Sequence, residues 1–273
     1  MICYDTHIHS EYSSDSKTPV AEQIKQAMKL GLTGICLTDH MDYDFPPDQF
    51  ECAPGTIPFE FDFHHYLVNC HKEQTIHDDF DFLIGVECGL QAIADVIQKN
   101  KTLVSCPDLD YVIGSLHLVN RQDPYYPKFW ESQNKSEVIQ TYFDQLYENL
   151  TSFSSFDSLG HLDYIVRYAP KPFTYEPKIF QEITDAILSF LIHHDIALEI
   201  NTSGLKSTPN TNPHMEFVKR YRELGGKLIT IGSDAHTPNY LAYQFDLVQA
   251  QLKACGFTEY TVFKKRTPCM LPL

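Results

Sequence analysis

Several features are missing from this sequence of 273 residues, and each absence excludes a class of protein. No apolar run approaches the roughly 18 residues of a transmembrane helix, and the N-terminus has neither the basic nor the apolar region of a secretory signal. There is no internal repeat and no low-complexity segment. We therefore expect a soluble, cytoplasmic protein whose residues 1–273 form one domain, since α/β barrels reach this length as single domains.

Basic residues are also scarce: 21 Lys and Arg stand against 36 Asp and Glu, which gives a formal net charge of −15. The phosphate backbone of a nucleic acid binds to cationic surfaces, so this charge argues against a nucleic-acid partner. Hydrophobic residues make up 43% of the chain, which is enough for a large core. A site that binds several metal ions would neutralise part of the acidic excess.

The eight cysteines contain no C-x-x-C motif and no paired spacing. Several lie inside apolar, strand-like runs, so we expect free thiols in a reducing compartment rather than disulfides. They are Cys3, Cys36, Cys52, Cys70, Cys88, Cys106, Cys255 and Cys269.

The most informative stretch is the start of the chain, where an apolar run ends in His7-Ile-His9-Ser and Asp15 follows. On an extended backbone residues two apart point the same way, so His7 and His9 could bind one metal ion. Taken alone, the motif fits a pair of surface histidines equally well. Five further apolar runs end in the same kind of residue, however. Their ends are Asp39-His40, Glu87, His117, His161 and Asp234-Ala-His236.

Strand-like and helix-like patterns alternate along the chain, which predicts an α/β protein with a parallel sheet. An open doubly wound sheet places its ligand near only a few strand ends. Six of the seven predicted strands end in candidate ligands, so a closed barrel with its site at the carboxyl ends of the strands fits better. The exception is the sixth strand, which ends in Asn201.

Helical patterns and two long loops separate these strands. Helices are expected over residues 19–31, 61–74, 136–152, 178–194, 212–224 and 241–255. Thr18 would cap the first helix, with Pro19 as its first residue. The loop 41–58 is acidic and rich in proline, as lids often are, and the loop 118–134 is rich in tyrosine and proline.

Six motifs, in this order along the chain, resemble those of the PHP (polymerase and histidinol phosphatase) superfamily. They are Asp5-Thr-His7-Ile-His9-Ser, Leu37-Thr-Asp-His40, Gly85-Val-Glu87, Gly114-Ser-Leu-His117, Gly160-His161-Leu-Asp and Gly232-Ser-Asp234-Ala-His236. Chain length, the loop after His40 and the segment from Gly160 to Tyr168 most resemble the histidinol-phosphate phosphatases. The resemblance implies a distorted seven-stranded, TIM-like (β/α)7 barrel with three divalent metal ions, for which Zn, Mn or Fe suits the ligand types.

The same resemblance divides nine residues among the three ions. The first ion would be held by His7, His9, Glu87 and Asp234. Glu87 would bridge to the second ion, which would also be held by His117 and His161. The third ion would be held by Asp15, His40 and His236, and some family members have histidine in place of Asp15.

Several residues have a plainer alternative role. Asp39 is interpreted as a partner that orients an imidazole, in preference to a direct ligand. Arg167 is either a surface arginine or a phosphate-binding residue, and the second is favoured; Ser10 and Asn201 are further candidates for substrate contact. The remaining histidines are interpreted as solvated or capping residues: His64, His65, His71, His77, His193, His194 and His214.

These residues predict hydrolysis of a phosphate monoester by attack of a metal-bridging hydroxide. Two close metal ions lower the pKa of a bridging water, while the third shares the phosphoryl oxygens. No protein nucleophile is then needed, and the sequence has neither a G-x-S-x-G elbow nor a C-x5-R phosphatase loop. Besides the bridging Glu87, Asp42 is the candidate proton donor to the leaving alkoxide, and Arg167 would clamp the phosphate.

Three functions compete. The favoured one is hydrolysis of L-histidinol phosphate to L-histidinol and inorganic phosphate, in histidine biosynthesis, with Asp42, Asp44 and Asp48 toward the substrate's cationic end. The second is a metal-dependent phosphoesterase that acts on nucleotides, short oligonucleotides or phosphotyrosine. The third is a non-catalytic scaffold, which the complete ligand set disfavours. The sequence carries no signal for an oligomeric state.

Overall fold

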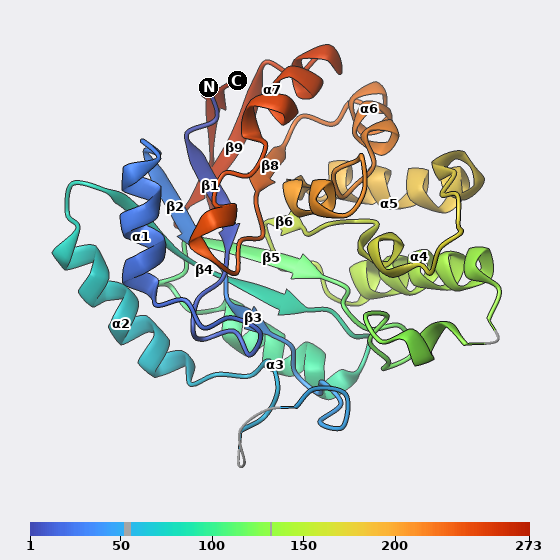
Figure 1. Ribbon diagram of the computed structural model, residues 1–273, viewed down its shortest axis with the longest axis horizontal. Helices are drawn as coiled ribbons and strands as arrows, with labels where there is room; N and C mark the ends of the chain where they lie inside the picture. The colour runs from blue at the N-terminus through green and yellow to red at the C-terminus, as the bar shows by residue number, and fades with distance from the viewer. Residues whose placement is uncertain (52–55, 132) are drawn as a thin grey trace.

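The computed structural model describes residues 1–51, 56–131 and 133–273. Its main sheet is parallel, with the strand order β1-β2-β4-β5-β6-β7-β8. These strands are β1 (Tyr4–Ile8), β2 (Gly34–Leu37), β4 (Asp81–Gly89), β5 (Tyr111–Ser115), β6 (Ser158–Leu159), β7 (Ala197–Asn201) and β8 (Ile229–Gly232). The two edges meet through a parallel bridge between Ile8 and Ala235, which nearly closes the sheet (Figure 1). The predicted seven-stranded barrel is confirmed.

The helices surround the strands, with α1 and α2 at the left of the view, α3 below the strands, and α4 to α6 at the right (Figure 1). They are α1 (Val20–Lys29), α2 (Phe63–Ile76), α3 (Ala94–Val104), α4 (Lys135–Ser152), α5 (Gln181–His193), α6 (Met215–Glu223) and α7 (Phe245–Ala254). The described residues also form short 3-10 helices: η1 (Pro127–Trp130), η2 (Tyr164–Tyr168), η3 (Pro177–Phe180), η4 (Thr202–Lys206) and η5 (Pro238–Tyr240). A short strand, β3 (His40–Met41), pairs with β4.

Two helix details differ from the sequence analysis. Helix α3 was not expected, because its buried face includes Asn100, which breaks the apolar period and donates to the Gly89 carbonyl. The predicted capping of α1 by Thr18 is wrong. Pro19 occupies the cap position without a side-chain hydrogen bond, and the Thr18 hydroxyl donates instead to the His236 carbonyl at 2.9 Å.

A C-terminal hairpin, for which the sequence analysis gave no prediction, covers the amino ends of the barrel strands. Its strands are β9 (Glu259–Lys264) and β10 (Thr267–Pro272), which pair antiparallel. Lys264 bonds to Asp81 at the start of β4, and Arg266 bonds to Asp157 just before β6. With this end closed, the carboxyl ends of the strands are left for a site.

Three further expectations from the sequence concern the loop 41–58, the cysteines and membrane-spanning helices. Residues 52–55 of the expected lid 41–58, Cys52 among them, lie outside the described residues. All the described cysteines are free thiols, as expected. None of the helices described is long and apolar enough to cross a membrane.

Candidate metal centre

Glu87 stands at the centre of the candidate ligands. It lies on β4 with no solvent exposure, and its two carboxylate oxygens face different imidazoles. One oxygen, Oε2, lies 3.2 Å from His7 Nε2 and 2.9 Å from His40 Nδ1. The other, Oε1, lies 2.9 Å from His161 Nε2 and 3.2 Å from His117 Nε2. Glu87 is therefore the residue that joins two groups of histidines.

The first group of potential ligands comes from β1 and from the turn after β8. His7 Nε2 and His9 Nε2 face each other at 3.1 Å, and both side chains are fully buried. Asp234 Oδ1 lies 3.3 Å from His9 Nε2. Asp234 has a left-handed backbone, with φ of 53°, a conformation that is uncommon for a residue with a side chain and concentrated at functional sites.

A second group pairs His117, after β5, with His161, after β6, whose Nε2 atoms lie 3.4 Å apart. A third group contains His9, His40 and His236, whose ligand atoms lie within 4.8 Å of one another. The predicted third-ion ligand Asp15 is beside this group, with Oδ2 3.0 Å from His236 Nε2. The fold thus gathers every residue predicted as a metal ligand.

The facing nitrogens of His7 and His9 are suited to a divalent ion. His7 Nδ1 faces the acceptor Glu199 Oε1, and His9 Nδ1 faces Ser13 Oγ, whose own proton goes to Asp39, so each neutral ring carries its proton on Nδ1. The two facing Nε2 atoms then both present lone pairs, which can bind a cation but not each other. Burial, with His236 and His40 nearby, lowers the His9 pKa well below its usual value, so this ring stays neutral. The buried atoms Glu87 Oε2 and His236 Nε2 make no hydrogen bond of normal geometry. The residues fit a divalent metal centre.

The outer nitrogens of these imidazoles are held by other side chains. Glu199 Oε1 lies 2.5 Å from His7 Nδ1, and Glu199 Oε2 accepts the backbone N–H of His161 at 2.8 Å. Asp42 Oδ1 lies 2.8 Å from His117 Nδ1. Carboxylates in such positions fix the tautomer of a metal-binding histidine and raise its basicity. The sequence analysis missed Glu199, although a single acidic residue within the apolar β7 strand was a signal for it.

Asp39 acts on an imidazole only through a serine. Its carboxylate accepts hydrogen bonds from the Ser10 and Ser13 hydroxyls at 2.7 and 2.6 Å, and Ser13 Oγ lies 3.0 Å from His9 Nδ1. Asp39 therefore holds the loop after β1, in agreement with an indirect role. Ser10, predicted to contact substrate, is buried, and its hydroxyl donates to Asp39.

Two cationic side chains, those of Arg167 and Lys206, lie close to Asp234. Arg167 on η2 donates to Asp234 Oδ2 at 3.5 Å and to Asn212 at 3.1 Å, while its buried Nε has no partner. Lys206, at the end of η4, approaches the Asp234 carbonyl at 3.5 Å, and burial lowers its pKa. Sequence reasoning missed Lys206. Asn201 also donates to Asp234, at 3.3 Å, so it lies beside the centre as a support for a carboxylate.

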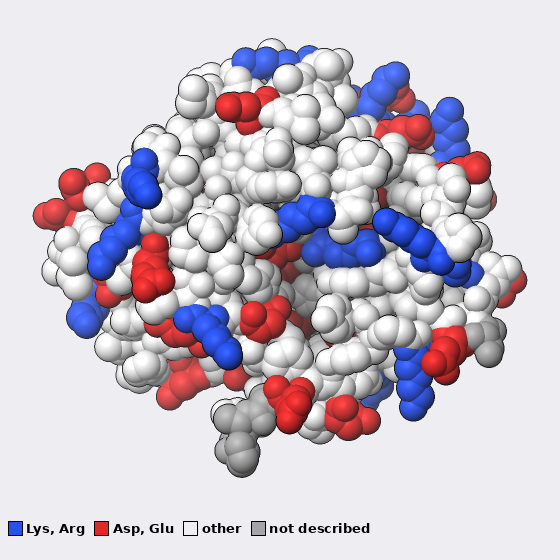
Figure 2. All heavy atoms as spheres, in the orientation of Figure 1, with Lys and Arg blue, Asp and Glu red and all other residues white. Residues whose placement is uncertain are grey.

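A hollow of about 250 Å³ opens beside this centre, and we call it the loop hollow. On one side it is lined by Asp15, His40, Asp42 and His117. The rest is lined by Asp123 and by aromatic rings from three loops: Phe45, Phe50, Phe59, Tyr125, Tyr126, Tyr164 and Tyr168. Figure 2 shows a depression near the middle of this face, with acidic side chains inside it and basic ones along one rim.

The acidic residues expected toward the substrate's cationic end do not all reach the loop hollow. Asp42 lines it, but its carboxylate is engaged by His117. Asp44 forms an ion pair with Arg121 at 2.8 Å, and Asp48 is exposed. Neither lines the hollow, so their predicted contact with substrate is not what the structure indicates.

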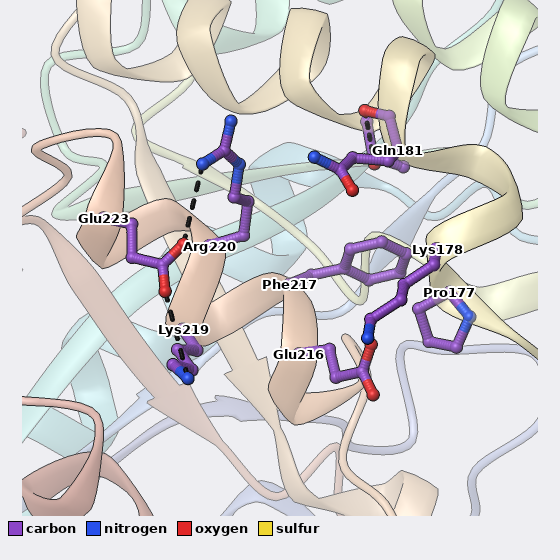
Figure 3. Close-up of a pocket in the computed structure, with 9 residues that line it drawn as sticks. Pro177, Lys178, Gln181, Glu216, Phe217, Lys219, Arg220 and Glu223 are labelled. Atoms are coloured by element: carbon purple, nitrogen blue, oxygen red, sulfur yellow. Dashed lines mark hydrogen bonds and ion pairs between the residues drawn. The ribbon is translucent and has the colours of Figure 1, made fainter.

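Another hollow, of about 300 Å³, lies between η3, the start of α5, and α6 (Figure 3). Three of its charged side chains pair with one another, since Glu223 contacts both Arg220 at 3.5 Å and Lys219 at 4.0 Å. Among the described residues no group of metal-ligating side chains lies there. The described side chains that could bind metal therefore lie at the carboxyl ends of the barrel strands and not in this second hollow.

The histidines left out of the ligand set lie away from the centre, among the residues that the structure describes. His214 caps α6 by accepting the Glu216 N–H at 3.2 Å, as the capping interpretation predicts. His193 and His194 contact backbone carbonyls at the end of α5.

Comparison with known proteins gives three findings. The family model described as PHP domain matches residues 5–203. A probable histidinol-phosphatase of Clostridium acetobutylicum is 32% identical over 267 residues, covering 96% of this chain and 97% of the relative. The crystal structure of histidinol phosphate phosphatase from Lactococcus lactis, complexed with Zn, L-histidinol and phosphate, is 28% identical, with a TM-score of 0.87 over 98% of this chain and 99% of that one.

Proposed function

The chain belongs to the PHP domain family, and on that premise we propose that it hydrolyses L-histidinol phosphate to L-histidinol and inorganic phosphate. The relatives named histidinol-phosphatase and the L. lactis complex support this activity and confirm the predicted class of enzyme. The observation within this chain that carries the proposal is the arrangement at Glu87, where each carboxylate oxygen faces its own set of imidazoles.

The centre binds divalent metal, and we propose that it holds three ions. The first would take His7, His9, Glu87 and Asp234, and the second would take Glu87, His117 and His161. Asp15, His40 and His236 would hold the third. Zinc is the metal in the L. lactis structure, and the imidazole and carboxylate ligands also suit Mn or Fe.

When bound, the ions would supply Lewis-acid activation of water and positive charge for the phosphoryl oxygens. The protein residues then hold the substrate and keep the ligands in place. Arg167 and Lys206 lie on the Asp234 side of the centre, where they would bind phosphate oxygens that the ions leave free. The buried Nε atom of Arg167, which has no partner, supports this role.

For Asp42 we propose an orienting role at His117 in place of the proton-donating role predicted from its position. A carboxylate that accepts the Nδ1 proton of a metal-bound imidazole must stay ionised, so it has no proton to deliver. Glu199 would act in the same way on His7.

The orienting role predicts the behaviour of Asp42→Asn and Glu199→Gln. Each variant is expected to lose roughly 10- to 100-fold in activity or metal affinity. The loss should be equal for histidinol phosphate and for p-nitrophenyl phosphate, whose leaving group needs no proton. Parallel kinetics on the two substrates test this; a loss by Asp42→Asn confined to histidinol phosphate would restore the proton donor.

The third ion is tested by Asp15→Ala. We expect this variant to release one metal equivalent and to lose most activity, because Asp15, His40 and His236 would be that ion's protein ligands, while Glu87 keeps the other two. Elemental analysis with parallel kinetics measures both. Asp79→Ala, at an exposed position before β4, is the control. Loss of all the metal, or of none, would contradict the division into a pair and a single ion.

The function itself is tested by phosphate release from a panel of substrates, with protein of measured metal content. We expect strong preference for histidinol phosphate over phosphotyrosine, nucleotides and phosphodiesters. Broad activity on phosphodiesters, with no preference for the amino-alcohol ester, would favour the second function considered from sequence.

A further inference from the structure

One acidic side chain that lines the loop hollow, Asp123, forms no ion pair with any residue that the structure describes. Of its three carboxylates, Asp15 contacts His236 and Asp42 contacts His117. In the described chain no basic side chain lies within ion-pair distance of Asp123, and its Oδ1 accepts only the Tyr125 N–H, at 2.8 Å. A partly buried carboxylate without a cation is costly, and a ligand cation would offset that cost.

The protein holds Asp123 in place with contacts between its two long loops. Gln49, from the loop after β3, accepts the Asp123 N–H at 2.7 Å and donates to the Arg121 carbonyl at 3.1 Å. Arg121 in turn pairs with Asp44 from that first loop at 2.8 Å. The backbone from Arg121 to Asp123 is therefore bonded to the loop after β3, which fixes the Asp123 carboxylate in the wall of the loop hollow.

The surroundings of Asp123 match an organic cation with an aromatic group. Tyr125, Tyr126 and the phenylalanines of the first loop supply aromatic faces that attract ammonium groups and stack with imidazole. The hollow also borders His40 and His117, so an ester whose phosphate lies at the metal centre would extend into it. In L-histidinol phosphate the ammonium is on the carbon next to the ester carbon, on the path between these two regions.

We propose that Asp123 binds the ammonium group of the amino-alcohol end of the substrate and is the specificity-determining residue of the loop hollow. This inference rests on the proposed function and deepens it. It places the recognition carboxylate on the loop after β5, not on the loop after β3 where the sequence had suggested it.

Inhibition by each product separately, followed through p-nitrophenyl phosphate hydrolysis, tests the proposal. For Asp123→Asn we expect the inhibition constant of L-histidinol to rise about 10- to 100-fold, the size of a lost charged hydrogen bond. The inhibition constant of inorganic phosphate should change less than about threefold. For the des-amino analogue imidazole-propanol, parent and variant should give equal constants. Asp123→Glu, which keeps the charge, should recover part of the L-histidinol affinity.

Asp79→Asn is the matched control, because it makes the same chemical change in an exposed turn before β4. Equal L-histidinol inhibition of the parent and Asp123→Asn would overturn the inference, as would a parent that L-histidinol does not inhibit. Neither result touches the proposed function, which fails separately if the parent releases no phosphate from histidinol phosphate. Equal losses of L-histidinol and phosphate affinity would show that Asp123 acts on the metal centre, which also overturns the inference.

Discussion

Glu87→Gln is expected to lose at least one metal equivalent and to lower kcat/KM on the order of a thousandfold, with the fold retained. Under the proposed metal assignment, Glu87 supplies one oxygen to each of two ions, and the neutral amide removes charge from both at nearly constant shape. Several kcal/mol of transition-state stabilisation depend on such ions, and each ~1.4 kcal/mol is a factor of ten in rate. Elemental analysis, circular dichroism and phosphate-release kinetics together measure the effect.

Glu73→Gln on α2 is the matched control, because it changes another buried glutamate in the same way but away from the centre. Its metal content and turnover should equal those of the parent. Full metal occupancy with near-normal turnover in Glu87→Gln would remove the bridging role and with it the assignment of the paired ions.

Arg167→Ala is expected to lower kcat/KM on the order of a hundredfold without changing bound metal. A buried guanidinium holds phosphate through two parallel, charge-assisted hydrogen bonds, and their loss costs a few kcal/mol. The side chain is only 13% exposed, and Tyr164 lies against its guanidinium with 4.8 Å between group and ring centre. Arg167→Lys should recover little, since a point charge cannot reproduce the planar fork.

Arg220→Ala provides the comparison, since Arg220 makes a bidentate contact with Asp185 between α5 and α6, away from the centre. Its kinetics should match those of the parent. Kinetics of Arg167→Ala within about threefold of the parent would mean that the phosphate is held elsewhere, and Lys206 would be the next residue to replace.

Two kinds of information could be read from the sequence. The barrel was predictable because several strands, such as β2 and β8, are short runs dominated by apolar residues, as is common for strands buried on both faces, and helical patterns separate the runs. The gathered ligands were predictable because parallel strands bring their carboxyl ends to one side, and six of these ends carry histidine or a carboxylate. The family, the fold and the enzyme class inferred from these motifs are confirmed. The roles of the individual site residues stay predictions.

The elements that the sequence did not predict correctly depend on local geometry or have weak periodicity. Thr18 had the composition of a helix cap, but its hydroxyl binds the His236 carbonyl, more than two hundred residues away in sequence. Helix α3 has a polar residue on its buried face, and the C-terminal hairpin owes its place to charges at the amino ends of β4 and β6. None of these contacts leaves a repeating pattern in the sequence.

The sequence by itself determined the barrel and the residues that meet at its mouth, because strand direction and side-chain alternation are properties of each strand alone. Only the tertiary structure decided what surrounds them. Glu199 reaches His7, Lys206 reaches Asp234, and Gln49 fixes Asp123 beside the centre. Each contact joins loops or strands far apart in the chain, so its existence depends on how the barrel closes and how its long loops pack.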